Sequence, residues 1–305
     1  KKPIAFITPI SHGQTDYSRA LREQAPHVSF LQEAYKALRA IASVTSRDER
    51  ELLARAEAAE MQPPAPDRRA LIEPLRSRAT QEPLALDEAQ SKEVLRAYGI
   101  VTPAEVLVRS PADAIAAAER IGYPVVLKAV SAELTHKSEL GAVALDLATS
   151  EQLVAAYAHM AHGLRGRHLA GMLVCRQIRG GLELALGLNR DPEMGLVVMA
   201  GSGGVMLELV KDVAFCAPPV TPEKARDLLA RLRVAKLLAG YRGAPAYDTD
   251  AVVDALVALG HLAADLNDIV QSVDINPFVA LPRGGMALDA LIVLQRRVQA
   301  PGSSG

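Results

Sequence analysis

From residue 84 onward, short apolar segments alternate with helical segments whose ends carry capping residues. Asp87 and Gly99 suit the start and the end of one helix, and Ser110-Pro111 suits the start of the next. Several strand-like segments then follow one another without a helix between them. This order predicts a mixed α/β and α+β fold built of packed layers. The expected strands are residues 101–108, 124–130, 142–147, 171–177, 182–189, 195–200, the segment around Phe215, 270–279 and 285–293, and the expected helices are residues 88–98, 110–122, 149–163, 222–238 and 249–266.

The start of the chain has a different organisation. Residues 4–8 are expected to form a strand, and residues 15–25 and 31–43 to form helices. So few elements do not fill an independent core, which makes residues 1–54 resemble the end of a larger α/β domain. Closely spaced prolines within residues 55–83 oppose a helix and favour an extended spacer, so we place a linker there.

Composition excludes several classes of partner. Aromatic residues make up 4% of the 305 residues, Trp is absent, and the net charge is -1 without a basic stripe, so nucleic acid is not an expected partner. No apolar run of about 18 residues occurs, so no membrane span is expected. Cys175 and Cys216 are too few for a disulfide framework and predict free thiols in a reducing cytoplasm. The strand-like start is unlike a signal peptide, and residues 301–305 are typical of a flexible tail.

Two neighbouring segments could bind phosphate groups. Lys128 follows a run of apolar strand residues, where a lone ammonium group is costly to bury. It could be a cation aimed at nucleotide phosphates, or it could leave the strand end toward solvent, and the residues alone leave both interpretations open. The loop after it contains His136, Lys137 and Ser138, whose donors could cover phosphates, although an ordinary charged surface loop has the same composition.

The most informative tetrapeptide runs from Asp274 to Pro277. Strand alternation puts Asp274 and Asn276 on one face, and two neighbouring oxygen ligands suit Mg²⁺. A hairpin at the turn 282–285 could bring Asp289 beside Asn276. The alternative is a turn-forming Asn-Pro with an exposed Asp289, but the chemistry of the residues favours a metal site.

A glycine-rich segment, Gly201-Ser202-Gly203-Gly204, follows an apolar strand and precedes Glu208. Its glycines permit a close approach of the backbone to an anion, although a tight turn is the alternative. The segment is not a P-loop, because no Gly-Lys-Ser/Thr follows it. Glu183, at the start of another strand, could accept a hydrogen bond from a ribose hydroxyl or could simply be solvated.

In this order, the segments resemble the ATP-grasp domain of NDP-forming acyl-CoA synthetases of the acetyl-CoA synthetase (ADP-forming) type. His136 points to this branch, because the succinyl-CoA branch has a glycine-rich loop instead. The resemblance covers residues 84–295 and implies an ATP-grasp domain at residues 84–298, made of two α+β subdomains, with a nucleotide-covering part at residues 102–176 inserted in the second. The residues that carry it are Lys128; His136-Lys137-Ser138; Gly181-Leu182-Glu183; Gly203-Gly204 with Glu208 and Lys211-Asp212; Arg242-Gly243; Asp274 to Pro277; and Asp289.

The resemblance implies how the phosphates of ATP or ADP would be handled. Lys128 would bind them, and the loop with Lys137 and Ser138 would close over them. His136 matches a histidine that would relay the phosphoryl group, and Glu208 falls at a catalytic position.

The resemblance also implies the metal and nucleoside ends of the site. Asn276 and Asp289 would bind Mg²⁺, with Asp274 beside the transferring phosphate. Glu183 would contact the ribose. The strand end that lines the adenine pocket, largely through backbone groups, would comprise Cys175, Gln177 and Ile178.

The implied reaction is acid + CoA + ATP ⇌ acyl-CoA + ADP + phosphate, through a phosphohistidine and with coenzyme A as co-substrate. Residues 1–50 resemble the last strand and helices of the flavodoxin-like CoA-ligase domain, but the sequence holds no counterpart of the upstream CoA-binding domain. We therefore expect this chain alone not to complete the reaction. Further domains, or a partner in a homo- or hetero-oligomer, would supply the sites for coenzyme A and the carboxylic acid.

Two other functions are open at this point. The same domain occurs in protein acetyltransferases, where it is a regulatory, non-catalytic module. An ATP-grasp ligase that acts on peptides or amines is a weaker alternative, because the Asp-x-Asn-Pro and His-Lys-Ser combination argues against it. The identity of the acid is not encoded in these residues.

Overall fold

The computed structural model describes residues 4–8, 15–25, 27–45, 66–131, 141–204 and 212–296. The chain divides into two compact units, Lys1–Gln62 and Pro63–Gly305, and each is described by itself. Within the described residues, no helix has both the length and the apolar character that crossing a membrane requires.

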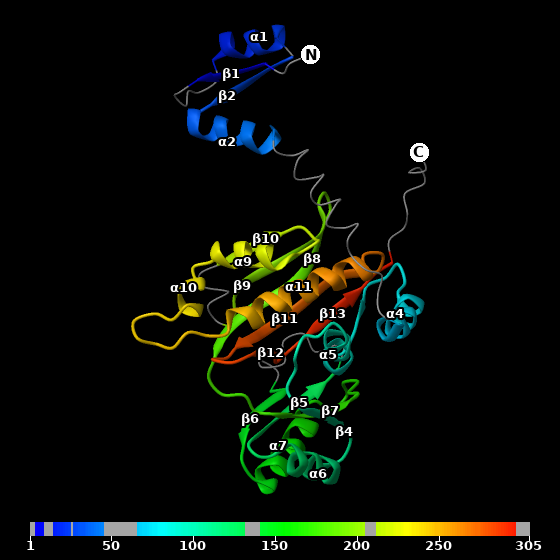
Figure 1. Ribbon diagram of the computed structural model, residues 1–305. Coiled ribbons are helices and arrows are strands. Elements are labelled where there is room, and N and C mark those ends of the chain that lie inside the picture. Colours follow the sequence, from blue (N-terminus) through cyan, green and yellow to red (C-terminus); the bar gives the residue numbers. More distant parts are fainter. Residues whose placement is uncertain are drawn as a thin grey trace. The chain divides into compact units, whose positions relative to one another are not determined.

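The first unit is a βαβα arrangement with strand β1 (Ile4–Thr8), helix α1 (Asp16–Gln24), strand β2 (Val28–Gln32) and helix α2 (Ala34–Thr45). The two strands pair in parallel, as a strand-helix-strand crossover requires (Figure 1). A helix over residues 31–43 was expected, but residues 31–32 belong to β2. They pair with the end of β1, and Glu33, with a φ of 60°, turns the chain before α2 begins.

Helix α4 (Pro66–Arg78) lies where an extended linker was expected, so that expectation is wrong for these residues. Proline is tolerated at the first position of a helix, because the N–H of that residue has no partner within the helix. Pro74 inside the helix does cost a hydrogen bond. Burial offsets this cost, because Ile72 and Leu75 are only 1% and 6% exposed in the main core.

The larger of two sheets in the second unit has seven antiparallel strands in the order β10-β9-β8-β11-β13-β3, with β12 paired to β11. Helices α9 and α11 pack on it, and their apolar side chains join its main core (Figure 1). The strands are β3 (Leu84–Ala85), β8 (Leu182–Asp191), β9 (Gly195–Ser202), β10 (Val213–Cys216), β11 (Val270–Ala280), β12 (Gly285–Ala287) and β13 (Leu291–Leu294), and the helices are α5 (Glu88–Ala97), α9 (Pro222–Ala230), α10 (Ala235–Leu238) and α11 (Thr249–Asp265).

The smaller sheet has four antiparallel strands in the order β4-β7-β5-β6, and helices α6 and α7 pack on one of its faces (Figure 1). On the other face, a small apolar cluster of β5 and β7 residues contacts Ala89 of α5. Helix α5 therefore lies between the smaller sheet and the strands of the larger one. The elements are β4 (Glu105–Val108), α6 (Pro111–Ile121), β5 (Val125–Val130), β6 (Val143–Leu147), α7 (Ser150–Gly163) and β7 (Gly171–Arg176).

Two expected elements are shorter or broken. The strand expected over residues 101–108 begins only at Glu105, because Val101 bonds instead to the larger sheet, where its carbonyl accepts from Ala287 N at 2.8 Å. The single helix expected over residues 222–238 is interrupted between α9 and α10. There, the N–H groups of Arg233 and Val234 donate to the carboxylate of Asp212.

Candidate functional site

Strand β11 carries the predicted metal-binding tetrapeptide. Val273 and Ile275 are buried in the core, so Asp274 and Asn276 share the opposite face of the strand. The pairing of β11 with β8 shifts register between Ile275 and Phe278, which separates Asn276 and Pro277 from regular pairing on that side.

Asp289 lies in the gap between β12 and β13, so the strand expected over residues 285–293 is interrupted there. Phe278 pairs with Ala287, and Leu288 N donates to Pro277 O at 2.9 Å. Continuing this antiparallel register by one residue on each strand puts Asp289 opposite Asn276. The two predicted metal ligands therefore face each other, Asn276 from β11 and Asp289 from the segment that joins β12 to β13.

Asp274 is near the same point. Part of its side chain is exposed to solvent, but neighbouring protein atoms remove water from around the carboxylate. This desolvation, together with the negative charge of Asp289, raises the pKa of Asp274 above its ordinary value. A bound cation would relieve the repulsion between the two carboxylates.

The glycine turn after β9 lies against Asn276 and Glu183. Gly204 N donates to the side-chain oxygen of Asn276 at 3.4 Å, and Gly203 N donates to Glu183 O at 2.9 Å. A Cβ built on Gly204 would lie 2.4 Å from a carboxylate oxygen of Glu183, and the φ of Gly204 is +56°. The left-handed backbone at Gly204 favours glycine, and any side chain there would have to displace the carboxylate of Glu183.

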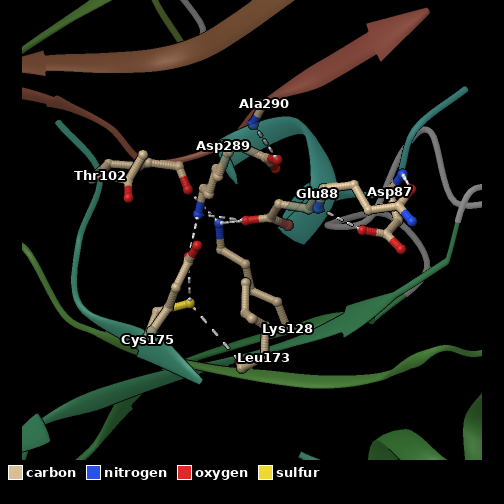
Figure 2. A network of polar contacts seen from close by, with 12 residues as sticks. Asp87, Glu88, Thr102, Lys128, Leu173, Cys175, Asp289 and Ala290 are labelled. Carbon is tan, nitrogen blue, oxygen red and sulfur yellow. Dashed lines mark hydrogen bonds and ion pairs between the residues drawn. The ribbon is translucent and has the colours of Figure 1, made fainter. Parts of the chain in front are cut away.

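Lys128 reaches this region from the smaller sheet. Strand alternation puts it on the same face as Val126 and Val130, which lie in the apolar cluster beside α5. Its ammonium group donates to a carboxylate oxygen of Glu88 and to Leu288 O, each at 2.7 Å (Figure 2). Of the two interpretations of Lys128, the one in which it leaves the strand end toward solvent is excluded, because the residue is only 9% exposed.

The charge of Lys128 is stabilised by its neighbours. Burial alone lowers the pKa of this ammonium group, but the negative charges of Glu88 and Asp289 outweigh burial, and the pKa is raised. Lys128 thus stays protonated beside the loop that carries Asp289.

Four charged residues of this region, Glu88, Lys92, Arg96 and Glu105, were missed in the sequence. Lys92 is fully buried and donates to Glu88 and to Glu105, each at 2.8 Å. Arg96 then donates to the other carboxylate oxygen of Glu105 at 3.0 Å. Glu88 and Lys92 lie on the buried stripe of α5 with Ser91 and Leu95, but in the sequence they have only the spacing of an ordinary surface pair.

The residues predicted to line an adenine pocket behave differently from one another. Cys175 is buried, its thiol lies 3.7 Å from Glu105, and desolvation raises its pKa to about 12. The side chain of Gln177 is held by Asp146: Gln177 donates to the carboxylate of Asp146 and accepts from its N–H, both at 2.8 Å. Ile178 is half-buried. The N–H of Gln177 also donates to Pro124 O at 3.3 Å, so Gln177 can offer a ligand its backbone carbonyl more readily than its side chain.

The structure brings together one set of predicted residues and does not describe another. Lys128, Glu183, Asp274, Asn276 and Asp289 gather where the two sheets approach each other. The predicted residues that lie outside the described part of the chain are His136, Lys137, Ser138 and Glu208.

The donor set fits Mg²⁺. Asn276, Asp289 and Asp274 offer amide and carboxylate oxygens, which are the ligands this hard cation prefers. In the described ranges, no group of three or more His, Cys, Asp or Glu side chains is arranged to enclose a metal. Two or three protein oxygens suit Mg²⁺ well, since it usually keeps several waters and binds substrate phosphates.

Known proteins similar to this chain were found by sequence and by structure. Residues 78–294 match the sequence profile of an ATP-grasp domain family. The beta subunit of ADP-forming acetate–CoA ligase I from Pyrococcus furiosus is 34% identical over 232 residues, which is 75% of this chain and 100% of that subunit. A trans-feruloyl-CoA synthase from an unknown prokaryotic organism is 38% identical over 215 residues, which is 68% of this chain and 30% of that protein.

Among solved structures, dinucleotide forming acetyl-coenzyme A synthetase 1 from Ca. Korarchaeum cryptofilum is similar to this chain with a TM-score of 0.69 and 33% identity. The similarity covers 75% of this chain and 99% of that one. That structure is a complex with coenzyme A, Ca-AMPCP and HgCl+.

Proposed function

The chain belongs to the ATP-grasp family of ADP-forming acyl-CoA ligases, and from this premise we propose that it binds Mg-nucleotide for the reaction acid + CoA + ATP ⇌ acyl-CoA + ADP + phosphate. The observation that carries the proposal is the convergence of Lys128, Asp274, Asn276 and Asp289 from two sheets. A protonated, buried lysine beside oxygen ligands for a divalent cation is suited to polyphosphate.

Each residue of this group has a proposed task. Asn276 and Asp289 hold Mg²⁺, and Asp274 lies beside the phosphate that is transferred. Mg²⁺, when bound, neutralises charge on the phosphate oxygens and helps to orient them. Lys128 adds a second positive charge, fixed by its hydrogen bonds to Glu88 and Leu288 O. Phosphoryl transfer depends mainly on this kind of positioning and charge stabilisation.

The nucleoside would lie along the segment that connects β7 to β8. Backbone groups from Cys175 to Ile178 are proposed to face the adenine, and Glu183 to face the ribose. The exposed carboxylate of Glu183, beside the glycine turn, supports a ligand contact.

The roles of four further residues rest on the resemblance of their motifs to the family. We assign His136 to phosphoryl relay through a phosphohistidine, and Lys137 and Ser138 to closing the loop over the phosphates. Glu208 is assigned a catalytic role.

Coenzyme A and the carboxylic acid are proposed to meet this site through further domains or through a partner subunit in an oligomer. The two free cysteines suit a reducing compartment, and we place the reaction in the cytoplasm. No relative or structural feature described above favours the regulatory role in a protein acetyltransferase.

The metal site is tested with Asn276→Ala and Asp289→Ala, using calorimetric titration with Mg-ADP. Each variant removes one of two proposed protein ligands. We expect Mg-ADP binding to weaken by more than about 100-fold, because even residues that only hydrogen-bond to a metal ligand cost about 10- to 100-fold when they are removed. Asp227→Ala, which removes an exposed carboxylate of α9, is the control and should bind as the unsubstituted chain does. Unchanged affinity in both Asn276→Ala and Asp289→Ala would sink the assignment.

A further inference from the structure

We infer that Glu88 is a positioning residue of the nucleotide site, and that it acts by holding the ammonium group of Lys128. The inference rests on the proposed binding of Mg-nucleotide. Glu88 itself lies in the first turn of α5 and accepts a hydrogen bond from Lys128 at 2.7 Å. We expect its effect on the site to pass through Lys128.

Three segments meet at the Lys128 ammonium group. Lys128 comes from β5 in the smaller sheet and Glu88 from α5 (Figure 2). Leu288 comes from the gap between β12 and β13. Leu288 directly precedes Asp289. The same ammonium group therefore joins the smaller sheet to the loop that carries a proposed metal ligand.

The carboxylate of Glu88 accepts from a second lysine as well. Lys92 and Lys128 donate to the same oxygen of Glu88, at 2.8 Å and 2.7 Å. Lys92 also donates to Glu105. Charge-assisted hydrogen bonds of this kind hold a supporting side chain in one position, which a functional site requires to within about 0.5 Å.

The burial of these three charged side chains costs free energy, so stability alone does not account for the arrangement. The side chains of Glu88 and Lys92 have no exposed surface, and that of Lys128 is 11% exposed. Removing such charges from water costs several kcal/mol per ion. A protein with apolar residues in place of a buried ion pair is often about equally stable, so the pair is weak evidence for stabilisation. An apolar pair at Glu88 and Lys92 would fill the space but would leave Lys128 without its carboxylate partner.

One N–H donor of the Lys128 ammonium group can serve a ligand. An ammonium group has three N–H donors. In the part of the chain that the structure describes, Lys128 uses two of them, on Glu88 and on Leu288 O. The third donor is then oriented by the first two, and a phosphate oxygen is the acceptor that the proposed function supplies. Glu88 thus sets the direction from which Lys128 meets the phosphate.

The test is a double-mutant cycle with Glu88→Gln and Lys128→Met, in which calorimetry measures Mg-ADP affinity and thermal unfolding measures stability. Glu88→Gln keeps the shape of the side chain and removes its charge. We expect it to weaken Mg-ADP binding by about 10- to 100-fold, the loss seen in metal sites when a residue that orients a direct ligand is removed. In the Lys128→Met background it should change the affinity by less than about twofold, because its target is gone.

Asp265→Asn is the matched structural control. It removes the charge of another carboxylate, whose side chain is 8% exposed and which accepts from Arg68 and from Tyr98. It should lower the unfolding temperature as Glu88→Gln does. The affinity for Mg-ADP should stay within about threefold, because a protein that is less stable but still folded keeps the geometry of a distant site. If Glu88→Gln does not fold, Glu88→Gln with Lys92→Met removes both charges of the pair and should show the same loss of affinity.

The outcomes separate the two claims. Unchanged affinity in Glu88→Gln, or an equal loss with and without Lys128, overturns the positioning role alone. A loss in Asp265→Asn as large as that in Glu88→Gln overturns it too, because the effect would then follow stability. If the unsubstituted chain binds no Mg-ADP, the proposed nucleotide site fails first, and this role fails with it.

Discussion

The carboxylate of Asp212 accepts three hydrogen bonds from two other segments. The N–H groups of Arg233 and Val234 each lie at 2.9 Å, and the hydroxyl of Ser202 lies at 3.1 Å. Burial by itself raises the pKa of this carboxyl group, but the hydrogen bonds outweigh burial, and the pKa is lowered below 3.8. The ionised form of Asp212 is therefore the form that holds the turn between α9 and α10.

Asp212→Asn is expected to lower the free energy of unfolding at pH 7 by about 1–3 kcal/mol, the range for hydrogen bonds to a charged group. Because the folded pKa is depressed, the contribution is complete above the unfolded value near 3.8 and is lost as pH falls through the lower, folded value. Urea unfolding at several pH values checks this. The difference between the two proteins should shrink below about pH 3.8. A difference that does not change with pH would contradict the assignment, and Asp227→Asn on the surface of α9 is the control.

The charged network around Lys128 shows what single residues reveal in a sequence. Lys128 itself could be singled out, because a cation among apolar strand residues is unusual. Its partner Glu88 could not, since the two are 40 residues apart and the contact depends on how α5 docks on the smaller sheet. Lys92 and Glu88 have the spacing of an ordinary surface pair, and nothing in that spacing indicates that both are buried.

At the scale of elements, α4 is the least expected part of the second unit, yet the packing makes it part of the core. Ile72, Leu75 and the following Ala79 join the main buried cluster. Arg76 donates to Asp268 at 3.0 Å and to the backbone of Asp265 at 3.0 Å, beside the end of α11. The apolar contacts decide the placement of this helix, because surface ion pairs contribute little.

Ile72→Ala should therefore lower the free energy of unfolding by about 2–5 kcal/mol, as removal of a buried isoleucine side chain does elsewhere. Arg69→Ala on the exposed side of the same helix is the control, and we expect a change within about 0.5 kcal/mol. Chemical denaturation followed by circular dichroism measures both. Equal stability of the two variants would mean that α4 is not packed against the core.

Hydrophobic periodicity and capping residues predicted most helices and strands, but they did not predict where a helix or strand is broken. The strand over residues 270–279 and the helix over 249–266 are confirmed within one residue at each end, because hydrophobic periodicity and the Asp248 cap mark them. The break after Ala230 was missed, because its cause is a carboxylate from another segment. The break at Asp289 was also missed, because β12 and β13 follow β11 in the same register on either side of it and the sequence alternates through it.

On the scale of the whole molecule, the predicted ATP-grasp fold is confirmed by the family match over residues 78–294 and by the solved structure with a TM-score of 0.69. The domain boundaries at residues 54, 83 and 298, and the flavodoxin-like origin of the first segment, stay predictions. The division between the sheets has a physical meaning for the proposed function. Lys128 belongs to one sheet and the oxygen ligands to the other, so nucleotide binding would join the two.

The second unit should bind nucleotide without the first. Its described buried clusters draw only on residues from Ile72 to Leu294, and Lys128, Asp274, Asn276 and Asp289 all lie within it. A chain of residues 63–305 is therefore expected to unfold in one cooperative transition and to bind Mg-ADP within about twofold of the full chain, which is less than 0.5 kcal/mol. Calorimetric titration and thermal unfolding measure both properties.

A chain that begins at residue 80 is the matched comparison for this truncation, because it also lacks α4. It should be less stable by several kcal/mol, since Ile72, Leu75 and Ala79 leave the core together. If the 63–305 chain failed to fold, or bound Mg-ADP more than about tenfold more weakly, residues 1–62 would have to contribute about 1.4 kcal/mol or more to the site. Their role would then be part of nucleotide binding and not confined to the acyl and coenzyme A half of the reaction.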